Sequence, residues 1–375
     1  MSAVTRSALA IPLAICAGLA LSGTAPAQRQ QQRAAHPAQQ TWPEQKEGDY
    51  TAQNFRFGSG EVLPELRLHY ITMGTPQRDA NGRVTNAVLI MHGTGGSGRQ
   101  FLSRQFAGEL YGPGQPLDAS RYFIILPDAI GHGGSSKPSD GLRMKFPQFD
   151  YDDMVRAQHL LVTEGLGLNH LRLVMGTSMG CMHSFVWAET YPDMMDALLP
   201  LACLPVEIAG RNRQWRKLAM DAIRNDPSWQ DGNYTEQPVG LRSSIALLQI
   251  VGLAPHQQQK SLSTREQADK ALEDYVATRM RTTDANDFLY QFNSSRNYHP
   301  APHLGKITAP VVHINFADDF INPPELGIAE REIKKVKRGR YILVPIGDDT
   351  VGHGTHTRAR VWKHHLVELL HDTEP

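Results

Sequence analysis

A serine between two glycines is the residue of this chain whose surroundings most clearly suggest chemistry. Gly176-Thr177-Ser178-Met179-Gly180 has the pattern G-x-S-x-G, in which the chain turns sharply from a strand into a helix and strains the serine backbone. The apolar run LRLVMG precedes the pattern, and CMHSFVWAETY follows it with helical spacing. A purely structural turn is the alternative, but the predicted strand and helix favour Ser178 as a nucleophile.

A serine nucleophile needs a histidine base, and the base needs an acid that orients it. In the chain order that accompanies this turn, the acid follows a late strand and the histidine follows the last one. Asp318 and Asp319 come directly after the apolar run VVHINF, and we favour Asp319 because two prolines follow it at the expected loop distance. His353 and His356 lie in DTVGHGTHT, and we favour His353 because a glycine precedes it.

Acyl chemistry at a serine also needs two backbone N–H groups that bind the developing oxyanion. We expect one from Met179, the residue after the nucleophile, and the other from Thr94 in the glycine-rich loop HGTGGSG. The same loop also matches G-x-G-x-x-G between Gly93 and Gly98, with Asp128 as the acid of a dinucleotide site. We favour the oxyanion loop, because it already accounts for the glycines.

The sequence does not favour a metal, a cofactor or a nucleic acid. His353 and His356 could bind a metal with Asp348 and Asp349, but His-x-x-His in a loop is a poor zinc signature. The chain has 38 Lys and Arg against 38 Asp and Glu, so it has no basic footprint for nucleic acid or anionic lipid. We predict a small-molecule acyl substrate and no cofactor or metal, and the sequence does not predict the oligomeric state.

The elements that must position these residues alternate along the chain. The segment ELRLHYITMG alternates like an early strand, and six further runs are typical of strands buried on both faces: NAVLIMHG, RYFIILPD, LRLVMG, DALLPLAC, APVVHINFADD and RYILVPIGDD. Helical segments lie between them, including DYDDMVRAQHLLVTEGLG and the final TRARVWKHHLVELLHD. This alternation predicts a doubly wound, mostly parallel sheet in which reactive residues gather at the carboxyl ends of the strands.

One long segment interrupts this alternation. Residues 205–303 read as helical throughout, and we interpret them as a cap inserted between the core segments 49–204 and 304–375. An insertion at this place can cover the active site and shape its pocket.

The start of the chain is typical of a secretory signal peptide. Residues 1–27 combine Arg6, the apolar run ALAIPLAICAGLAL and a small-residue cleavage site near Ala27, with an uncleaved anchor as the alternative. Residues 28–48 are rich in Gln, Ala and Pro and predict a disordered lead-in. Export places the protein in the periplasm or outside the cell, where Cys181 and Cys203 could pair, although we favour two buried free thiols.

Two longer segments add a family resemblance. LPDAIGHGGSSKPSD resembles a segment of many α/β-hydrolases, and DMVRAQHLLVTEGLGLNHLRLVMGTSMGCMHSFVWAETYPD closely resembles the homoserine O-acetyltransferase branch of that superfamily, as does DANDFLYQF. The resemblance covers most of the chain from about residue 50. It implies the α/β-hydrolase fold with a helical cap and the following site residues: Ser178 as nucleophile, Asp319 as acid, His353 as base, and Thr94 and Met179 as oxyanion donors.

These features predict an exported serine hydrolase that cleaves an ester, or an amide or lactone, through an acyl-enzyme on Ser178. The alternative is an acyltransferase similar to homoserine O-acetyltransferase. The signal peptide favours water as the acyl acceptor, because acetyl-CoA is a cytosolic donor. A binding protein on a retired hydrolase scaffold is the least favoured interpretation, because serine, acid and histidine are all present.

Overall fold

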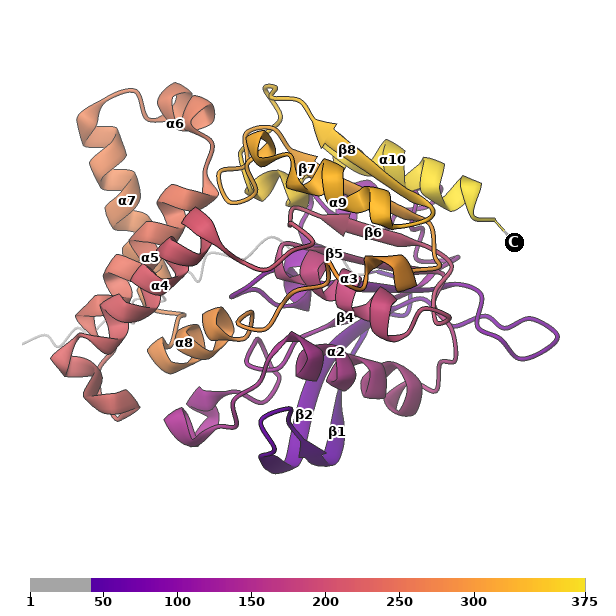
Figure 1. Cartoon of the computed structure of the whole chain (residues 1–375), viewed down its shortest axis with the longest axis horizontal. Helices are drawn as coiled ribbons and strands as arrows, with labels where there is room; N and C mark the ends of the chain where they lie inside the picture. The colour runs from indigo at the N-terminus through magenta and orange to yellow at the C-terminus, as the bar shows by residue number, and fades with distance from the viewer. Residues whose placement is uncertain (1–41, 375) are drawn as a thin grey trace, which may run out of the picture. The chain divides into compact units, whose positions relative to one another are not determined.

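The computed structural model describes residues 42–374 (Figure 1). The predicted signal peptide and the lead-in as far as residue 41 lie outside this range. The described residues include the end of the predicted disordered lead-in 28–48, and this part is structured: strand β1 starts at Lys46, and Trp42 is only 7% exposed. Within the described residues no helix has both the length and the apolar character that a membrane crossing requires.

Eight strands of the described chain form one sheet in the order β1-β2-β4-β3-β5-β6-β7-β8. The first two strands pair antiparallel with their neighbours, and the remaining strands are parallel. The strands are β1 (Lys46–Arg56), β2 (Val62–Met73), β3 (Ala87–Met91), β4 (Phe123–Pro127), β5 (Leu173–Thr177), β6 (Leu198–Leu201), β7 (Val311–Phe316) and β8 (Gly339–Val344). The seven predicted strands are β2 to β8, so the predicted mostly parallel sheet is confirmed.

Alternate residues of the central strands enter two separate hydrophobic cores. In β3, Leu89 and Met91 pack into the core that α2 (Tyr151–Leu160) and α3 (Met179–Thr190) cover. The neighbouring Val88 and Ile90 enter the core beneath α1 (Ala107–Leu110) and α10 (Ala359–Asp372). Helices therefore cover both faces of the sheet, which explains why these strands read as unbroken apolar runs.

Five helices between β6 and β7 form a cap with its own hydrophobic core, centred on residues such as Trp215 and Phe288. They lie within the interval 205–303 and are grouped on the left of Figure 1: α4 (Gly210–Arg224), α5 (Val239–Gly252), α6 (Pro255–Ser261), α7 (Arg265–Met280) and α8 (Ala285–Asn293). Helix α6 also falls within this interval, although its polar segment PHQQQKS buries no residue and so has no apolar face.

Candidate active site

Ser178 lies at the turn between β5 and α3, at the carboxyl end of the sheet. Its backbone has φ 56° and ψ −110°, a conformation that is costly for a residue with a side chain. The flanking glycines are needed because α3 starts so close to the sheet. A Cβ on Gly176 would overlap the Gly180 carbonyl, and one on Gly180 would overlap the Met91 carbonyl at the end of β3. The turn is therefore compatible only with glycine at both positions.

Three predicted side chains form one hydrogen-bonded chain at this edge of the sheet. The Ser178 Oγ lies 2.8 Å from His353 Nε2, and His353 Nδ1 lies 2.8 Å from Asp319 Oδ2. Because the carboxylate can only accept, Nδ1 carries the hydrogen and Nε2 is free to accept the serine hydroxyl proton. The serine precedes α3, the acid follows β7 and the histidine follows β8, so three distant segments meet here.

The Asp319 carboxylate is held in a buried and fully bonded position, with the residue 2% exposed. Its Oδ1 accepts from the N–H of Ile321 at 2.8 Å, and its Oδ2 accepts from Asn322 Nδ2 at 2.9 Å. Burial pushes the pKa of this carboxyl upward, but the facing His353 and the hydrogen bonds from Asn322 outweigh burial and leave that pKa below its ordinary value. Asp319 therefore stays ionised opposite the imidazole.

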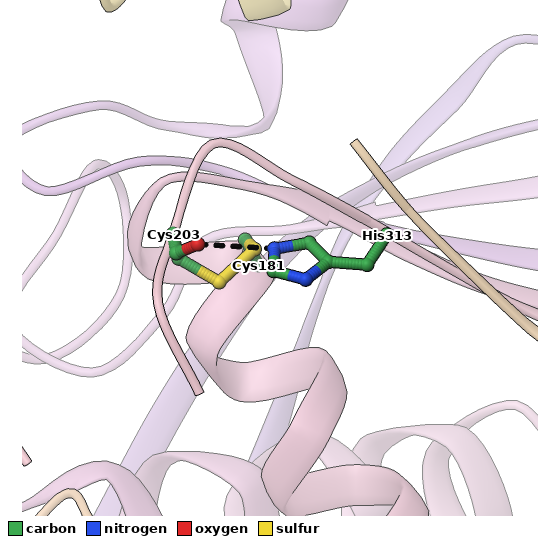
Figure 2. Close-up of side chains that lie close together, drawn as sticks. All are labelled: Cys181, Cys203 and His313. Atoms are coloured by element: carbon green, nitrogen blue, oxygen red, sulfur yellow. Dashed lines mark hydrogen bonds between the residues drawn. A yellow bond between two sulfur atoms is a disulfide. The ribbon is translucent and has the colours of Figure 1, made fainter. Parts of the chain in front are cut away.

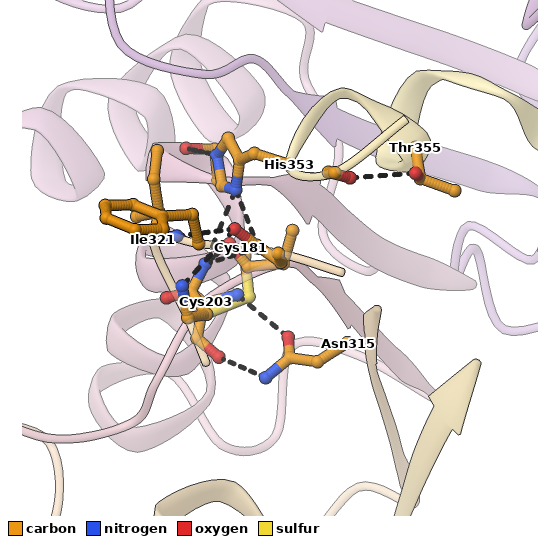
Figure 3. A network of polar contacts seen from close by, with 12 residues as sticks. Cys181, Cys203, Asn315, Ile321, His353 and Thr355 are labelled. Atoms are coloured by element: carbon orange, nitrogen blue, oxygen red, sulfur yellow. Dashed lines mark hydrogen bonds and ion pairs between the residues drawn. A yellow bond between two sulfur atoms is a disulfide. The ribbon is translucent and has the colours of Figure 1, made fainter. Parts of the chain in front are cut away.

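Asn322 is a site residue that the sequence analysis missed. Besides the acid, its Nδ2 donates to the Ala202 carbonyl at 3.0 Å, which ties the acid loop to the end of β6. Figure 3 shows this network around His353, Ile321 and Cys203. The available signal was an amide side chain three residues after an aspartate in a tight loop, where such groups bond locally.

Asp318 and His356, the alternative candidates for acid and base, lie beside His353 but have other contacts. Asp318 Oδ2 accepts from the N–H of Gly352 at 3.0 Å, so this carboxylate secures the histidine loop and does not contact the imidazole. The His356 ring is 5.2 Å from the His353 ring between centroids. Burial, together with the neighbouring His353, lowers the pKa of His356 to about 3. His356 is therefore a neutral residue that packs against His353.

The carboxylates of the alternative metal site are engaged elsewhere. Asp348 pairs with Lys260 of α6 at 3.1 Å, and Asp349 pairs with Arg360 of α10. Within residues 42–374, these two carboxylates do not converge with His353 and His356 on a common point.

The glycine-rich loop passes directly beside Ser178. A Cβ built on Gly93 would lie 3.3 Å from the Ser178 Cβ, so the loop comes very close to Ser178 at this residue. The N–H of Thr94 belongs to the next residue along the chain. Met179 opens α3, and the N–H groups of a first helical turn have no acceptor within the helix. Both predicted donors thus belong to segments that adjoin the serine hydroxyl.

Asp128 stabilises this loop. Its Oδ1 accepts from the N–H of Gly98 and its Oδ2 from the N–H of Gly134, both at 2.7 Å. Both carboxylate oxygens therefore bind the backbone of the polypeptide, so Asp128, the acid of the alternative dinucleotide site, has a structural role.

Cys181 and Cys203 form a disulfide, which corrects the expectation of two free thiols. Both cysteines are buried, but burial does not prevent pairing, because α3 starts beside the end of β6 and the two Cα atoms are 5.8 Å apart. Figure 2 shows the bridge beside His313, whose Nε2 donates to the Cys203 carbonyl at 3.0 Å. Strand order, which the sequence does not show, brings the sulfurs together.

We expect the double variant Cys181→Ala/Cys203→Ala to lose about 3 kcal/mol of unfolding free energy, because the bridge closes a loop across 22 positions. Urea unfolding of both proteins with and without dithiothreitol measures this loss. Reductant should bring the wild type to the stability of the variant and leave the variant unchanged. Equal stability of the two oxidised proteins would show that the bridge contributes nothing.

A cavity of about 590 Å³ opens onto Ser178. Ser178 and His353 form part of its wall, the cap contributes Arg216, and its apolar lining includes Met182 and Val206. A second cavity of about 410 Å³ is lined by the stretch from Thr94 to Ser97 and by the cap residues Arg279 and Gln291. Concave, mostly apolar sites with few polar groups are typical of small-molecule binding.

Comparison with known proteins agrees with this architecture. The family model described as alpha/beta hydrolase fold matches residues 86–344. A homoserine O-acetyltransferase of Pelobacter propionicus is 30% identical over 80% of this chain and 89% of its own length. The crystal structure of homoserine O-acetyltransferase from Bacillus anthracis superimposes with a TM-score of 0.75 at 21% identity, covering 87% of this chain and 97% of that one. An acetylester hydrolase from Corynebacterium glutamicum superimposes with a TM-score of 0.74 at 21% identity, over 87% and 96% of the two chains.

The chain is thus an enzyme of the α/β-hydrolase fold family. Within that family it belongs to the branch of the homoserine O-acetyltransferases, as its sequence resemblance predicted.

Proposed function

We propose that the chain transfers an acyl group by way of an acyl-enzyme on Ser178. The single observation that carries this proposal is the hydrogen-bonded chain from Ser178 through His353 to Asp319. Ser178 Oγ attacks the carbonyl carbon and its proton passes to His353 Nε2, while Asp319 stabilises the imidazolium. The oxyanion accepts hydrogen bonds from the N–H groups of Thr94 and Met179. The leaving group departs with the proton from His353.

In the second half-reaction, a nucleophilic oxygen attacks the acyl carbon of the acyl-enzyme and His353 accepts its proton; the bond from Ser178 Oγ to the acyl carbon then breaks, and Oγ takes that proton back from His353. We propose the hydroxyl of a small molecule as this acceptor, so that the overall reaction is acyl transfer. Support comes from the homoserine O-acetyltransferases at 30% identity and from a relative named probable acyltransferase in Methanothermobacter thermautotrophicus. These relatives favour transfer over the hydrolysis that we expected first.

Hydrolysis is the second candidate, with water in place of the hydroxyl acceptor. The observation that favours it is the signal-peptide pattern of residues 1–27, since an exported enzyme works apart from cytosolic acetyl-CoA. Solved structures of this fold include an acetyl esterase with a TM-score of 0.74 at 24% identity, which shares the fold. The same nucleophile, base and oxyanion donors serve both acceptors, so the candidates differ only in the second half-reaction.

One experiment distinguishes acyl transfer from hydrolysis. The purified protein is given acetyl-CoA or p-nitrophenyl acetate, each with and without homoserine. For a transferase we expect homoserine to speed CoA release at least tenfold and an O-acetylated product to form. Cleavage of p-nitrophenyl acetate at a rate that is independent of any hydroxyl acceptor would favour hydrolysis. If neither donor reacts and a fluorophosphonate probe does not label Ser178, the proposal of a serine acyl-enzyme is wrong.

A further inference from the structure

The disulfide between Cys181 and Cys203 lies next to Ser178. Cys181 is the third residue after Ser178 and belongs to the first turn of α3, while Cys203 is the second residue after the end of β6. Cys203 also lines the same cavity as Ser178. The bridge therefore joins the helix that starts after Ser178 to the strand end beside it.

Each of the two segments that the bridge joins contains a residue with a costly backbone conformation. Ser178 has φ 56° and Ala202 has φ 65°, although neither residue is a glycine. The segments are in contact, because the Ser178 N–H donates to the Leu201 carbonyl at 2.9 Å. A residue with a side chain stays in such a conformation only where its surroundings hold it there. The bridge is a covalent constraint on both residues.

Two polar residues of β7 anchor the Cys203 end of the bridge (Figures 2 and 3). His313 and Asn315 are at most 1% exposed. Asn315 Oδ1 accepts from the Cys203 N–H at 3.1 Å, and the Cys203 carbonyl accepts from Asn315 Nδ2 and His313 Nε2, both at 3.0 Å. Burial lowers the pKa of His313 to about 4, so the imidazole donates as a neutral group. With both of its backbone groups bonded, Cys203 is a fixed point to which the bridge ties α3.

The same strand end supports the loop of the proposed acid. The Ala202 carbonyl accepts from Asn322 Nδ2 at 3.0 Å, and this amide also donates to Asp319 at 2.9 Å. Asp319 in turn contacts His353. A displacement of the strand end therefore reaches Asp319, and a displacement of α3 reaches Ser178. The bridge holds the two ends of the hydrogen-bonded chain in place relative to each other.

Opening the bridge would disturb this arrangement. Two separate thiols need more room than a disulfide, and both cysteines are buried in a close-packed interior. The strained backbones of Ser178 and Ala202 would also lose a constraint that opposes their relaxation. Because a misplacement of about 1 Å at reacting atoms can slow a reaction about 10²-fold, a small shift of α3 against β6 is enough to affect the rate.

We propose that the Cys181–Cys203 bridge positions Ser178 and Asp319 for reaction, so that acyl chemistry at Ser178 requires the oxidised pair and slows when the pair is reduced. This inference rests on the proposed function of Ser178 and holds for either acyl acceptor. The cysteines are positioning residues, and they exchange no proton with Ser178 or His353.

A dithiol reduces the pair in two exchange steps. We place the first attack at Cys203, because this residue lines the cavity. A thiolate of the dithiol attacks Cys203 Sγ, the bond between the two cysteine sulfurs breaks, and the Cys181 sulfur leaves with the electron pair and takes up a proton. The second thiolate of the dithiol then attacks the mixed disulfide, and Cys203 leaves and is protonated. The dithiol becomes a disulfide, so two electrons have passed to the cysteines.

The first test compares oxidised, reduced and reoxidised wild type. Dithiothreitol reduces the protein, and gel filtration under argon removes the reagent, since free thiols attack p-nitrophenyl acetate. Alkylation and mass measurement confirm the state of both cysteines. We expect reduction to lower kcat on p-nitrophenyl acetate and the rate of fluorophosphonate labelling of Ser178 by about tenfold or more, with little change in KM, and reoxidation to restore both rates. Equal rates for the oxidised and reduced proteins would overturn the proposal.

The second test separates positioning from stability. Cys181→Ala/Cys203→Ala should have the low rates with or without dithiothreitol. Leu168→Ala is the matched control: Leu168 is 1% exposed and precedes β5, at the edge of the sheet opposite Ser178, and its truncation also destabilises the fold. Assayed well below its unfolding temperature, this variant should keep both rates. An equal loss of rate in the two variants would refute positioning by the bridge. If oxidised wild type neither turns over nor labels at Ser178, the proposed function itself is wrong.

Discussion

Replacing Ser178 with alanine is expected to lower kcat for any acyl substrate by about 10⁴-fold or more, because no acyl-enzyme can form. Asp319→Asn should cost about 10⁴-fold, because the amide no longer holds the histidine in the tautomer that leaves Nε2 free. Both effects act on kcat far more than on KM, since neither side chain is needed to fill the cavity. Single-turnover and steady-state rates on p-nitrophenyl acetate measure them.

The proposed triad also predicts that its members do not act independently. The double variant Ser178→Ala/His353→Ala should be no slower than Ser178→Ala, because the base has no function without its nucleophile. His364→Ala is the matched control: it removes an exposed histidine of α10 that lies outside this hydrogen-bonded chain. A Ser178→Ala protein with at least a tenth of wild-type activity would contradict the assignment of the nucleophile.

Gly180→Ala is expected to destabilise the protein by more than about 4 kcal/mol or to prevent folding. The new Cβ would overlap the backbone carbonyl of Met91, and a backbone atom at the end of β3 cannot rotate away as a side chain could. Relief requires α3 to move off the sheet, and that movement also displaces the N–H of Met179. Urea unfolding measures the loss, and any folded variant should be slower on p-nitrophenyl acetate.

Gly252→Ala is the control for this substitution. Gly252 ends helix α5, a Cβ there meets nothing within 4 Å, and its backbone does not have a positive φ. Alanine should change the unfolding free energy by no more than about 1 kcal/mol, because only the intrinsic helix propensity differs. Comparable stability of the two variants would show that the approach of α3 to β3 can relax without cost.

Much of the fold could be predicted because the strands of a doubly wound sheet are buried on both faces. Runs such as NAVLIMHG and VVHINF are therefore mostly apolar, and this pattern is visible in a single sequence. Strand β1 escaped prediction for the opposite reason. It lies at the edge of the sheet, its residues are mostly exposed, and only pairing with β2 gives it order.

Part of the candidate site followed from chain order. A serine in a strained turn, with an acid and a histidine after later strands, limited the choice to two aspartates and two histidines. Residue types could not separate Asp318 from Asp319, because both follow β7 directly. The direction in which each carboxylate points decides, and Asp319 faces the imidazole whereas Asp318 faces the Gly352 N–H.

By itself the sequence determined the fold family, the turn that strains Ser178 and the order of the residues that could serve it, because local pattern and spacing carry that information. Tertiary structure decided what depends on contacts between distant segments. The cysteines pair because β6 ends beside α3. Asn322 ties the Asp319 loop to the end of β6, because its side chain donates a hydrogen bond to the Ala202 carbonyl. Arg216 reads as one more cation on an amphipathic helix, and only the folded chain shows it buried in the wall of the cavity that contains Ser178.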